Sequence, residues 1–111
     1  MGYSIKSRIW IERKGETLLG EGRVSLLKAV GEHGSISAAA KSLNMSYKKA
    51  WSLLDAVNAR AKHPVITSNI GGAGGGGAQL TDYGMQLIET FDQINQNCWK
   101  FLDKEIKNSN L

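Results

Sequence analysis

Residues 35–61 read SISAAAKSLNMSYKKAWSLLDAVNARA, and this stretch predicts two helices separated by a short turn. Ser35 and Ser46 each stand where a serine hydroxyl can accept a hydrogen bond from an unpaired first-turn amide, so each is expected to cap a helix. Asn44 lies between them, and asparagine tolerates the left-handed conformation at a helix end. Two helices joined by so few residues must cross sharply, which predicts a helix-turn-helix.

The two predicted helices carry different residues for different purposes. The first, at about 36–43, contains three consecutive alanines, whose small size allows a close approach of the second helix. The second runs to about Ala61, and its apolar residues lie on one stripe: Ala50, Leu53, Leu54 and Val57. A plain helical hairpin remains the alternative to a DNA-binding motif.

The amino-terminal end of the second helix is the candidate DNA-binding surface. Such a helix presents its first residues to the major groove, where lysine can donate to guanine and hydroxyls can reach bases or phosphates. Lys41 and Arg60 could hold flanking phosphates. Trp51 could stack on the DNA backbone, although packing beneath the helix is the favoured interpretation because tryptophan buries much apolar area. The predicted contacts in this region are Ser35, Ser37, Lys41, Ser46, Tyr47, Lys48, Lys49, Trp51 and Ser52.

The distribution of charge favours the same region. The chain has a formal net charge of +4. Between Gly34 and Gln79 there are five basic residues and one acidic residue, whereas the rest of the chain has nine of each. The whole net charge therefore falls in the central segment, as a localised anion-binding face requires. A chance excess of solvated lysines is the alternative.

A glycine-rich segment follows the two helices. Residues 65–70 favour a strand, residues 71–77 are almost all glycine, and Gln79 and Leu80 can return as a second strand, which predicts a hairpin at about 65–80. The run lacks the lysine and hydroxyl residue of a P-loop and the spacing of a dinucleotide fold. It is better interpreted as a wing whose amides face phosphate, with contacts from Gly74, Gly75 and Gly76. An exposed turn without contacts remains possible.

Both ends of the chain are expected to support a dimer. Residues 4–12 alternate in polarity and residues 17–19 could return, which predicts a hairpin at about 4–19, followed by a helix at about 21–32. Thr81 is expected to cap a long helix at about 82–106 with apolar residues at coiled-coil-like spacing. The predicted dimer contacts are Ile9, Ile11, Leu87, Phe91, Ile94, Cys98 and Phe101.

Length and composition exclude several classes of protein. A chain of 111 residues with 41% apolar residues has room for a single domain, 1–111. The sequence contains no apolar run near the ~20 residues of a membrane span and no secretion signal pattern, so a cytoplasmic protein without a membrane partner is expected. Cys98, His33 and His63 are too isolated for a metal site. No cofactor and no catalytic constellation is apparent, so an enzyme is not expected.

Three motifs in order resemble the amino-terminal domain of the ModE family. These bacterial molybdate-responsive transcription regulators are related to the LysR-type winged helices. The motifs are GSISAAAK at 34–41, MSYKKAW at 45–51 and the glycine run followed by Gln79-Leu80-Thr81, and the likeness extends from about Glu21 to Phe91. The resemblance implies a dimeric winged helix in which the amino-terminal strand and the last helix help to form the dimer.

Two departures from that family change what the resemblance implies. Members commonly carry basic residues in the wing where this chain has Ala73 and Ser68, so the wing should bind more weakly and the second helix should supply most of the affinity. Full-length members continue into a carboxy-terminal molybdate-binding domain. Because this chain ends at Leu111, molybdate binding by that route is not expected unless the chain is a fragment.

The predicted fold is mostly helical with small β-hairpins, namely a winged helix-turn-helix at about 35–80 followed by a long dimerisation helix. The predicted function is sequence-specific binding of double-stranded DNA by a homodimeric transcription regulator of the ModE type. The alternative is a winged-helix module for protein interaction or dimerisation, in which Trp10, Trp51 and Trp99 contact a partner. Regulation by a small molecule at the dimer interface is a third hypothesis, and the sequence selects no ligand for it.

Overall fold

The fold is mostly helical with two small antiparallel hairpins, as predicted. The computed structural model describes residues 2–68 and 77–111. In the described residues the elements are, in chain order, β1 (Trp10–Arg13), β2 (Glu16–Gly20), α1 (Glu21–His33), α2 (Ile36–Ser42), α3 (Tyr47–Arg60), β3 (Ile66–Ser68), β4 (Ala78–Leu80) and α4 (Asp82–Lys107).

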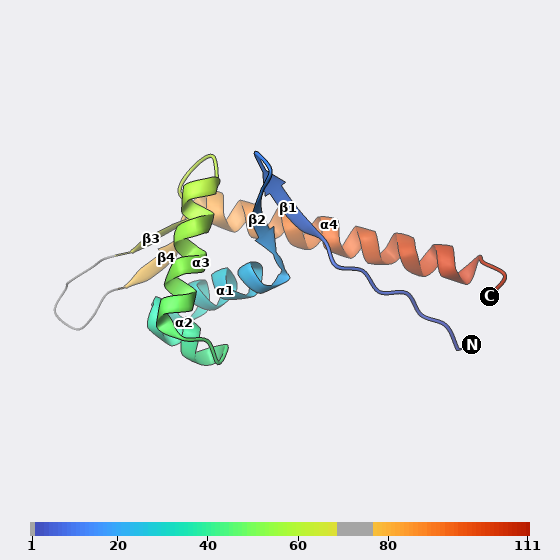
Figure 1. Ribbon diagram of the computed structural model, residues 1–111, viewed down its shortest axis with the longest axis horizontal. Helices are drawn as coiled ribbons and strands as arrows, with labels where there is room; N and C mark the ends of the chain where they lie inside the picture. The colour runs from blue at the N-terminus through green and yellow to red at the C-terminus, as the bar shows by residue number, and fades with distance from the viewer. Residues whose placement is uncertain (1, 69–76) are drawn as a thin grey trace.

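The described part of the molecule is elongated because α4 projects far beyond the packed body. Figure 1 shows α1, α2 and α3 gathered at one end beside the β3–β4 hairpin, while α4 and the amino-terminal segment run together toward the other end. The principal extents are 62 × 29 × 21 Å. The two chain ends therefore lie at the same end of the molecule, away from the helix-turn-helix.

The amino-terminal hairpin is shorter than predicted. β1 begins at Trp10 rather than near Ser4, and pairs with β2 through a two-residue turn in which Lys14 and Gly15 both have positive φ, 54° and 80°. The predicted alternation is still present, since Ile5, Ser7, Ile9 and Ile11 are half-buried and the residues between them are exposed. Residues 2–9 lack a strand partner and lie instead beside α4, where the Ser7 Oγ is 3.6 Å from the Cys98 Sγ.

A single core joins the hairpins and the four helices. Helix α1 lies at its centre, because Leu26, Leu27 and Val30 are fully buried. Around it pack Leu19 from β2 and the apolar stripe of α3, together with buried residues of both wing strands. This core packs the helix-turn-helix against the base of the β3–β4 hairpin.

Phe91 was predicted as a dimer contact but belongs to this core. Its side chain is 1% exposed, because the first half of α4 packs against α1 and buries its apolar face inside the subunit. Only beyond this point does α4 leave the body, so Ile94 and Phe101 are 47% and 61% exposed. None of the described helices combines the length and apolar character needed to cross a membrane.

Candidate nucleic-acid interface

The turn between α2 and α3 has the predicted geometry. The Ser35 Oγ accepts from the backbone amide of Ala38 at 3.1 Å, and the Ser46 Oγ accepts from that of Lys49 at 3.1 Å. Asn44 has a φ of 54°, and the Met45 amide then donates back to the Ala40 carbonyl at 2.9 Å. Both serine caps and the left-handed asparagine are therefore confirmed, and together they determine the direction in which α3 leaves the turn.

Helix α3 packs on the body by one stripe and exposes the other side. Ala50, Leu54 and Val57 are buried, and Leu53 is half-buried at the edge. The predicted contact residues of this helix are all exposed: Tyr47, Lys48, Lys49, Trp51 and Ser52. A shallow hollow of about 330 Å³ lies on this side of the helix and is lined by Ser46, Lys48, Lys49, Ser52 and Leu53.

Trp51 is the main correction within α3. Its side chain is 48% exposed, so it does not pack beneath the helix as the sequence favoured. The reason is its position in the helix, since it follows the buried Ala50 by one residue and is rotated about 100° away from the core. A large apolar ring therefore stands at the surface next to Lys48.

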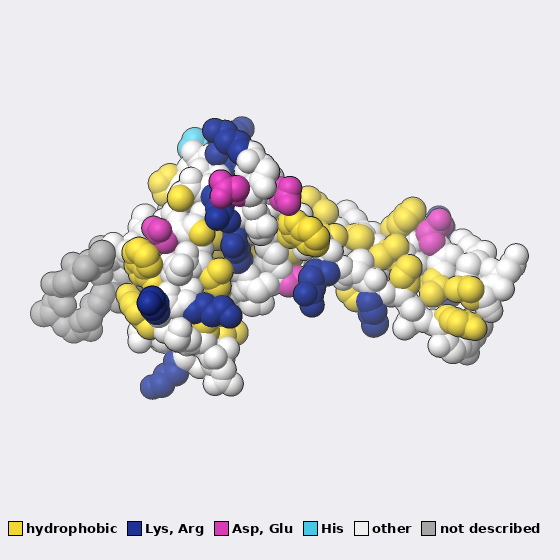
Figure 2. Space-filling model, viewed as in Figure 1, with side chains coloured by type: hydrophobic (Ala, Val, Ile, Leu, Met, Phe, Trp, Pro, Cys, Tyr) yellow, Lys and Arg dark blue, Asp and Glu magenta, His cyan; other side chains and the backbone are white. Residues whose placement is uncertain are grey.

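Some basic residues around α3 are exposed, and others form contacts within the subunit. Lys41 of α2 and Ser37 are exposed close to the turn, and Figure 2 shows lysine and arginine side chains over this part of the molecule. Arg60 is different, because it forms an ion pair with Glu16 at 3.2 Å and donates to the Thr17 carbonyl at 2.8 Å. Arg60 therefore anchors β2 to α3, which corrects its predicted role with flanking phosphates.

Arg23 reaches the same carbonyl from α1. Its guanidinium donates to Thr17 at 2.6 Å, and burial, followed by the charge of Arg60, lowers the pKa of Arg23 from its usual value. The two arginines thus join α1 and α3 to the hairpin. They form a structural anchor at the carboxyl end of α3, far from Ser46.

Asn58 connects α3 to the wing, and sequence reasoning did not identify it. Its Oδ1 accepts from the backbone amides of Val65 and Ile66 at 2.8 and 3.1 Å, and its Nδ2 donates to the Ile66 carbonyl at 2.8 Å. The signal available in the sequence was only an asparagine near a helix end. Its partners lie across a turn, and their distance from Asn58 depends on the tertiary fold.

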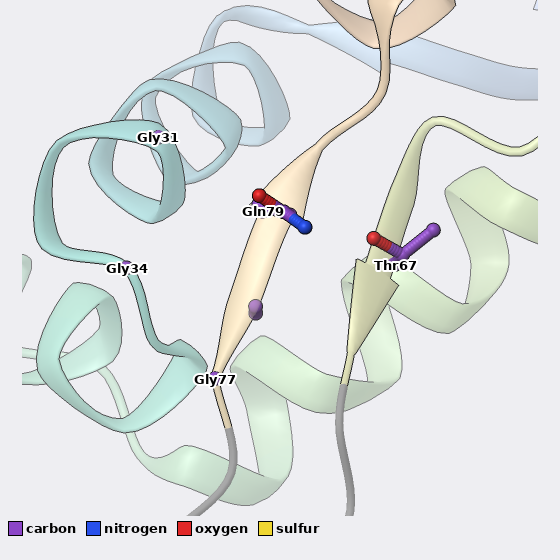
Figure 3. Close-up of a pocket in the computed structure, with 6 residues that line it drawn as sticks. Gly31, Gly34, Thr67, Gly77 and Gln79 are labelled. Atoms are coloured by element: carbon purple, nitrogen blue, oxygen red, sulfur yellow. The ribbon is translucent and has the colours of Figure 1, made fainter.

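The wing strands are also tied to the beginning of the helix-turn-helix. The Ala78 amide donates to the Gly34 carbonyl at 2.9 Å. A cavity of about 380 Å³ lies at this junction, lined by Gly31, Gly34, Thr67, Gly77, Ala78 and Gln79. Figure 3 shows Thr67 and Gln79 on the paired strands β3 and β4 beside this cavity. The predicted wing contacts Gly74, Gly75 and Gly76 lie outside the described residues.

The other residues of the predicted dimer surface divide into two groups. Ile9, Ile11 and Leu87 are half-buried against the core of their own subunit. Ile94, Cys98 and Phe101 lie on the part of α4 beyond the body, where Ile94 and Phe101 are exposed and Cys98 is half-buried beside Ser7. The dimer contact itself stays a prediction.

Comparison with known proteins identifies the family of this chain. The family model described as the bacterial regulatory helix-turn-helix protein, lysR family, matches residues 22–85, which is more than half of the chain. The chain therefore belongs to this family of DNA-binding transcription regulators. The match extends from α1 through the first turn of α4 and so includes the helix-turn-helix and both wing strands.

Individual relatives confirm the resemblance to the ModE family. The chain is 44% identical to the molybdenum-pterin-binding protein MopB of Rhodobacter capsulatus, over 91% of the chain and 37% of the relative. It is 36% identical to the molybdenum transport protein ModE of Azotobacter vinelandii, over 88% and 36%. It is 43% identical to the DNA-binding transcriptional dual regulator ModE of Escherichia coli (strain K12), over 73% and 31%. The chain thus spans about a third of the length of these curated relatives.

Proposed function

We propose that this chain binds specific double-stranded DNA sequences as a homodimeric transcription regulator of the ModE type. Each subunit inserts the amino-terminal half of α3 into a major groove, and the two grooves lie about one DNA turn apart. The observation that carries the proposal is the outer side of α3, where Lys48, Lys49 and Ser52 are exposed on a helix whose opposite side is anchored in the core.

The charge of this surface supports binding to a polyanion. The ion pairs found among the described residues are Lys28 with Asp92 and Arg60 with Glu16, so neither engages Lys48 or Lys49. The ammonium groups of these two lysines need not give up an internal partner when phosphate approaches. Each lysine that neutralises a phosphate releases counterions from the DNA, and this release favours binding.

The distal half of α4 supports the dimer. Ile94 and Phe101 are seven residues apart, a heptad spacing that places them on the same side of the helix. Both are exposed where α4 extends beyond the body, and Cys98 lies between them. A second copy of α4 against this side would remove the exposed apolar surface from water, which favours association.

A DNA-binding titration with two double variants tests the proposal. The duplex is first enriched from a random pool by the purified chain, and binding is followed by fluorescence anisotropy at several salt concentrations. The variant with Lys48→Ala and Lys49→Ala is expected to bind about 10- to 100-fold more weakly. It should also show a salt slope reduced by about 0.9 for each lost phosphate contact.

The matched control is Lys104→Ala with Lys107→Ala, which removes the same charge from the far end of α4. This control should bind like the wild type because these lysines lie away from the helix-turn-helix. Equal losses in the two variants would reject α3 as the DNA-binding element and leave only nonspecific attraction. Failure of the wild-type chain to enrich any duplex would reject DNA binding and favour the protein-interaction module.

A further inference from the structure

Two aromatic side chains of α3, Tyr47 and Trp51, are exposed and lie outside the core of the subunit. Tyr47 is 56% and Trp51 is 48% exposed. Tryptophan is usually mostly buried, so an exposed one on a well-packed helix is informative. The two residues are one helical turn apart and therefore neighbours on the helix surface.

The exposed side of α3 is chemically asymmetric. With 100° per residue, Lys48 and Ser52 point most directly away from the buried Ala50. Lys49 lies on one flank, where the 330 Å³ hollow is lined by two lysines and two serines together with Leu53. Tyr47 and Trp51 lie on the opposite flank. The helix therefore has a cationic flank and an aromatic flank, with a polar strip between them.

The aromatic flank is poorly suited to phosphate. Asp55 follows Trp51 by one turn and is exposed, so a phosphate along this flank would meet a carboxylate as well as an apolar ring. In the major groove the one apolar group on a base edge is the 5-methyl group of thymine. Because half of the Trp51 side chain is already covered by the protein, part of its mobility is lost before any DNA arrives.

We infer that Trp51, supported by Tyr47, contacts the 5-methyl group of thymine and so determines part of the sequence specificity of α3. This inference rests on the proposed DNA binding. The two aromatic residues are separated by about 6 Å along the helix. Two side chains so close together can reach only neighbouring base pairs, so we expect one or two thymines in each half-site to be contacted.

Replacing thymine by uracil tests this inference, because the change removes only the methyl group. Each thymine of the enriched duplex is replaced in turn, and the affinity of the wild-type chain is measured by anisotropy. One or two positions in each half-site should lose about three- to fivefold in affinity, as expected for one buried methyl group. The remaining positions should change little.

The variants separate a direct contact from an effect on DNA shape. Trp51→Ala should bind the thymine duplex more weakly and bind the thymine and uracil duplexes equally well. Trp51→Gln, which keeps bulk at this position, should also lose the discrimination, and Trp51→Phe should keep part of it. Lys48→Ala should lower affinity for both duplexes without changing their ratio. Trp10→Ala, which removes another exposed tryptophan that lies outside α3, should change neither the affinity nor the ratio.

Two results would overturn the inference while leaving DNA binding intact. One is a wild-type chain that binds every uracil-substituted duplex as tightly as the parent. The other is a folded Trp51→Ala variant that keeps the same preference for thymine, which would show that Trp51 does not contact the methyl group. If the wild-type chain enriched no duplex, the proposed function would fail first and the inference with it.

Discussion

Asn58 lets a single side chain satisfy three backbone groups at the junction of α3 and the wing. The backbone amides of Val65 and Ile66 donate to the Asn58 side chain, and both residues are almost fully buried. Water therefore cannot replace the Asn58 side chain as their partner. Buried polar groups without a partner cost about 1–3 kcal/mol each. Asn58 is therefore expected to be important for stability although it contacts no proposed ligand.

Asn58→Ala should lower the free energy of unfolding by about 2–4 kcal/mol, measured by urea denaturation, because the backbone groups of Val65 and Ile66 lose their partner. Asn97→Ala is the matched control. The Asn97 side chain accepts only from the exposed Gln93 at 3.2 Å, and its loss should cost less than about 0.5 kcal/mol. Similar losses in the two variants would show that Asn58 does not anchor the wing.

At the scale of the element, α4 begins in close contact with the turn before β3. The Thr81 hydroxyl accepts from the Gly84 amide at 2.9 Å and donates to the Pro64 carbonyl at 2.7 Å, and the Thr81 amide donates to the Val65 carbonyl at 3.0 Å. A Cβ at Gly84 would overlap the same Val65 carbonyl oxygen. Glycine at this position therefore allows α4 to approach the backbone of the wing.

Gly84→Ala should destabilise the protein by about 1–3 kcal/mol, because the overlapped atom belongs to the backbone and cannot rotate away. Gly22→Ala is the matched control in the first turn of α1. A Cβ at Gly22 would meet no atom within 4 Å, so this variant should be neutral or more stable by up to about 1 kcal/mol. Thermal unfolding of both variants measures the difference, and a stabilising Gly84→Ala would contradict the close approach.

At the scale of the whole molecule, the two halves of α4 have different surroundings. Its first half completes the core through Ile88 and Phe91, and its second half extends beyond the body with Ile94 and Phe101 exposed. The proposed DNA-binding side of α3 lies toward the opposite end of the long axis from both chain ends. Association through the second half of α4 would therefore leave the exposed side of α3 free.

Ile94→Glu combined with Phe101→Glu should convert the proposed dimer into a folded monomer, because each charge would be buried in the seam. Gln96→Glu combined with Lys100→Glu places two acidic residues on another side of the same helix segment and should leave the dimer intact. Sedimentation velocity measures the mass of each variant. A wild-type chain that is monomeric at high concentration would contradict the seam.

The local features of the fold could be predicted from the sequence because their causes lie within a few residues. Each of the caps Ser35, Ser46 and Thr81 bonds an amide three residues along the chain. Asn44 has the expected left-handed conformation for the same local reason. The apolar stripe of α3 follows from helical periodicity alone, so the exposure of its other side could be predicted from the sequence. That this exposed side binds DNA stays a prediction.

The features that were not predicted depend on contacts between segments distant in the chain. Trp51 was expected inside and stands outside, Phe91 was expected at a subunit contact and is in the core, and Arg60 is paired with Glu16. Residue type and spacing describe which side of a helix is apolar. Which neighbour covers that side, and which carbonyl or carboxylate lies within reach of an arginine, is decided only when the helices and hairpins pack together.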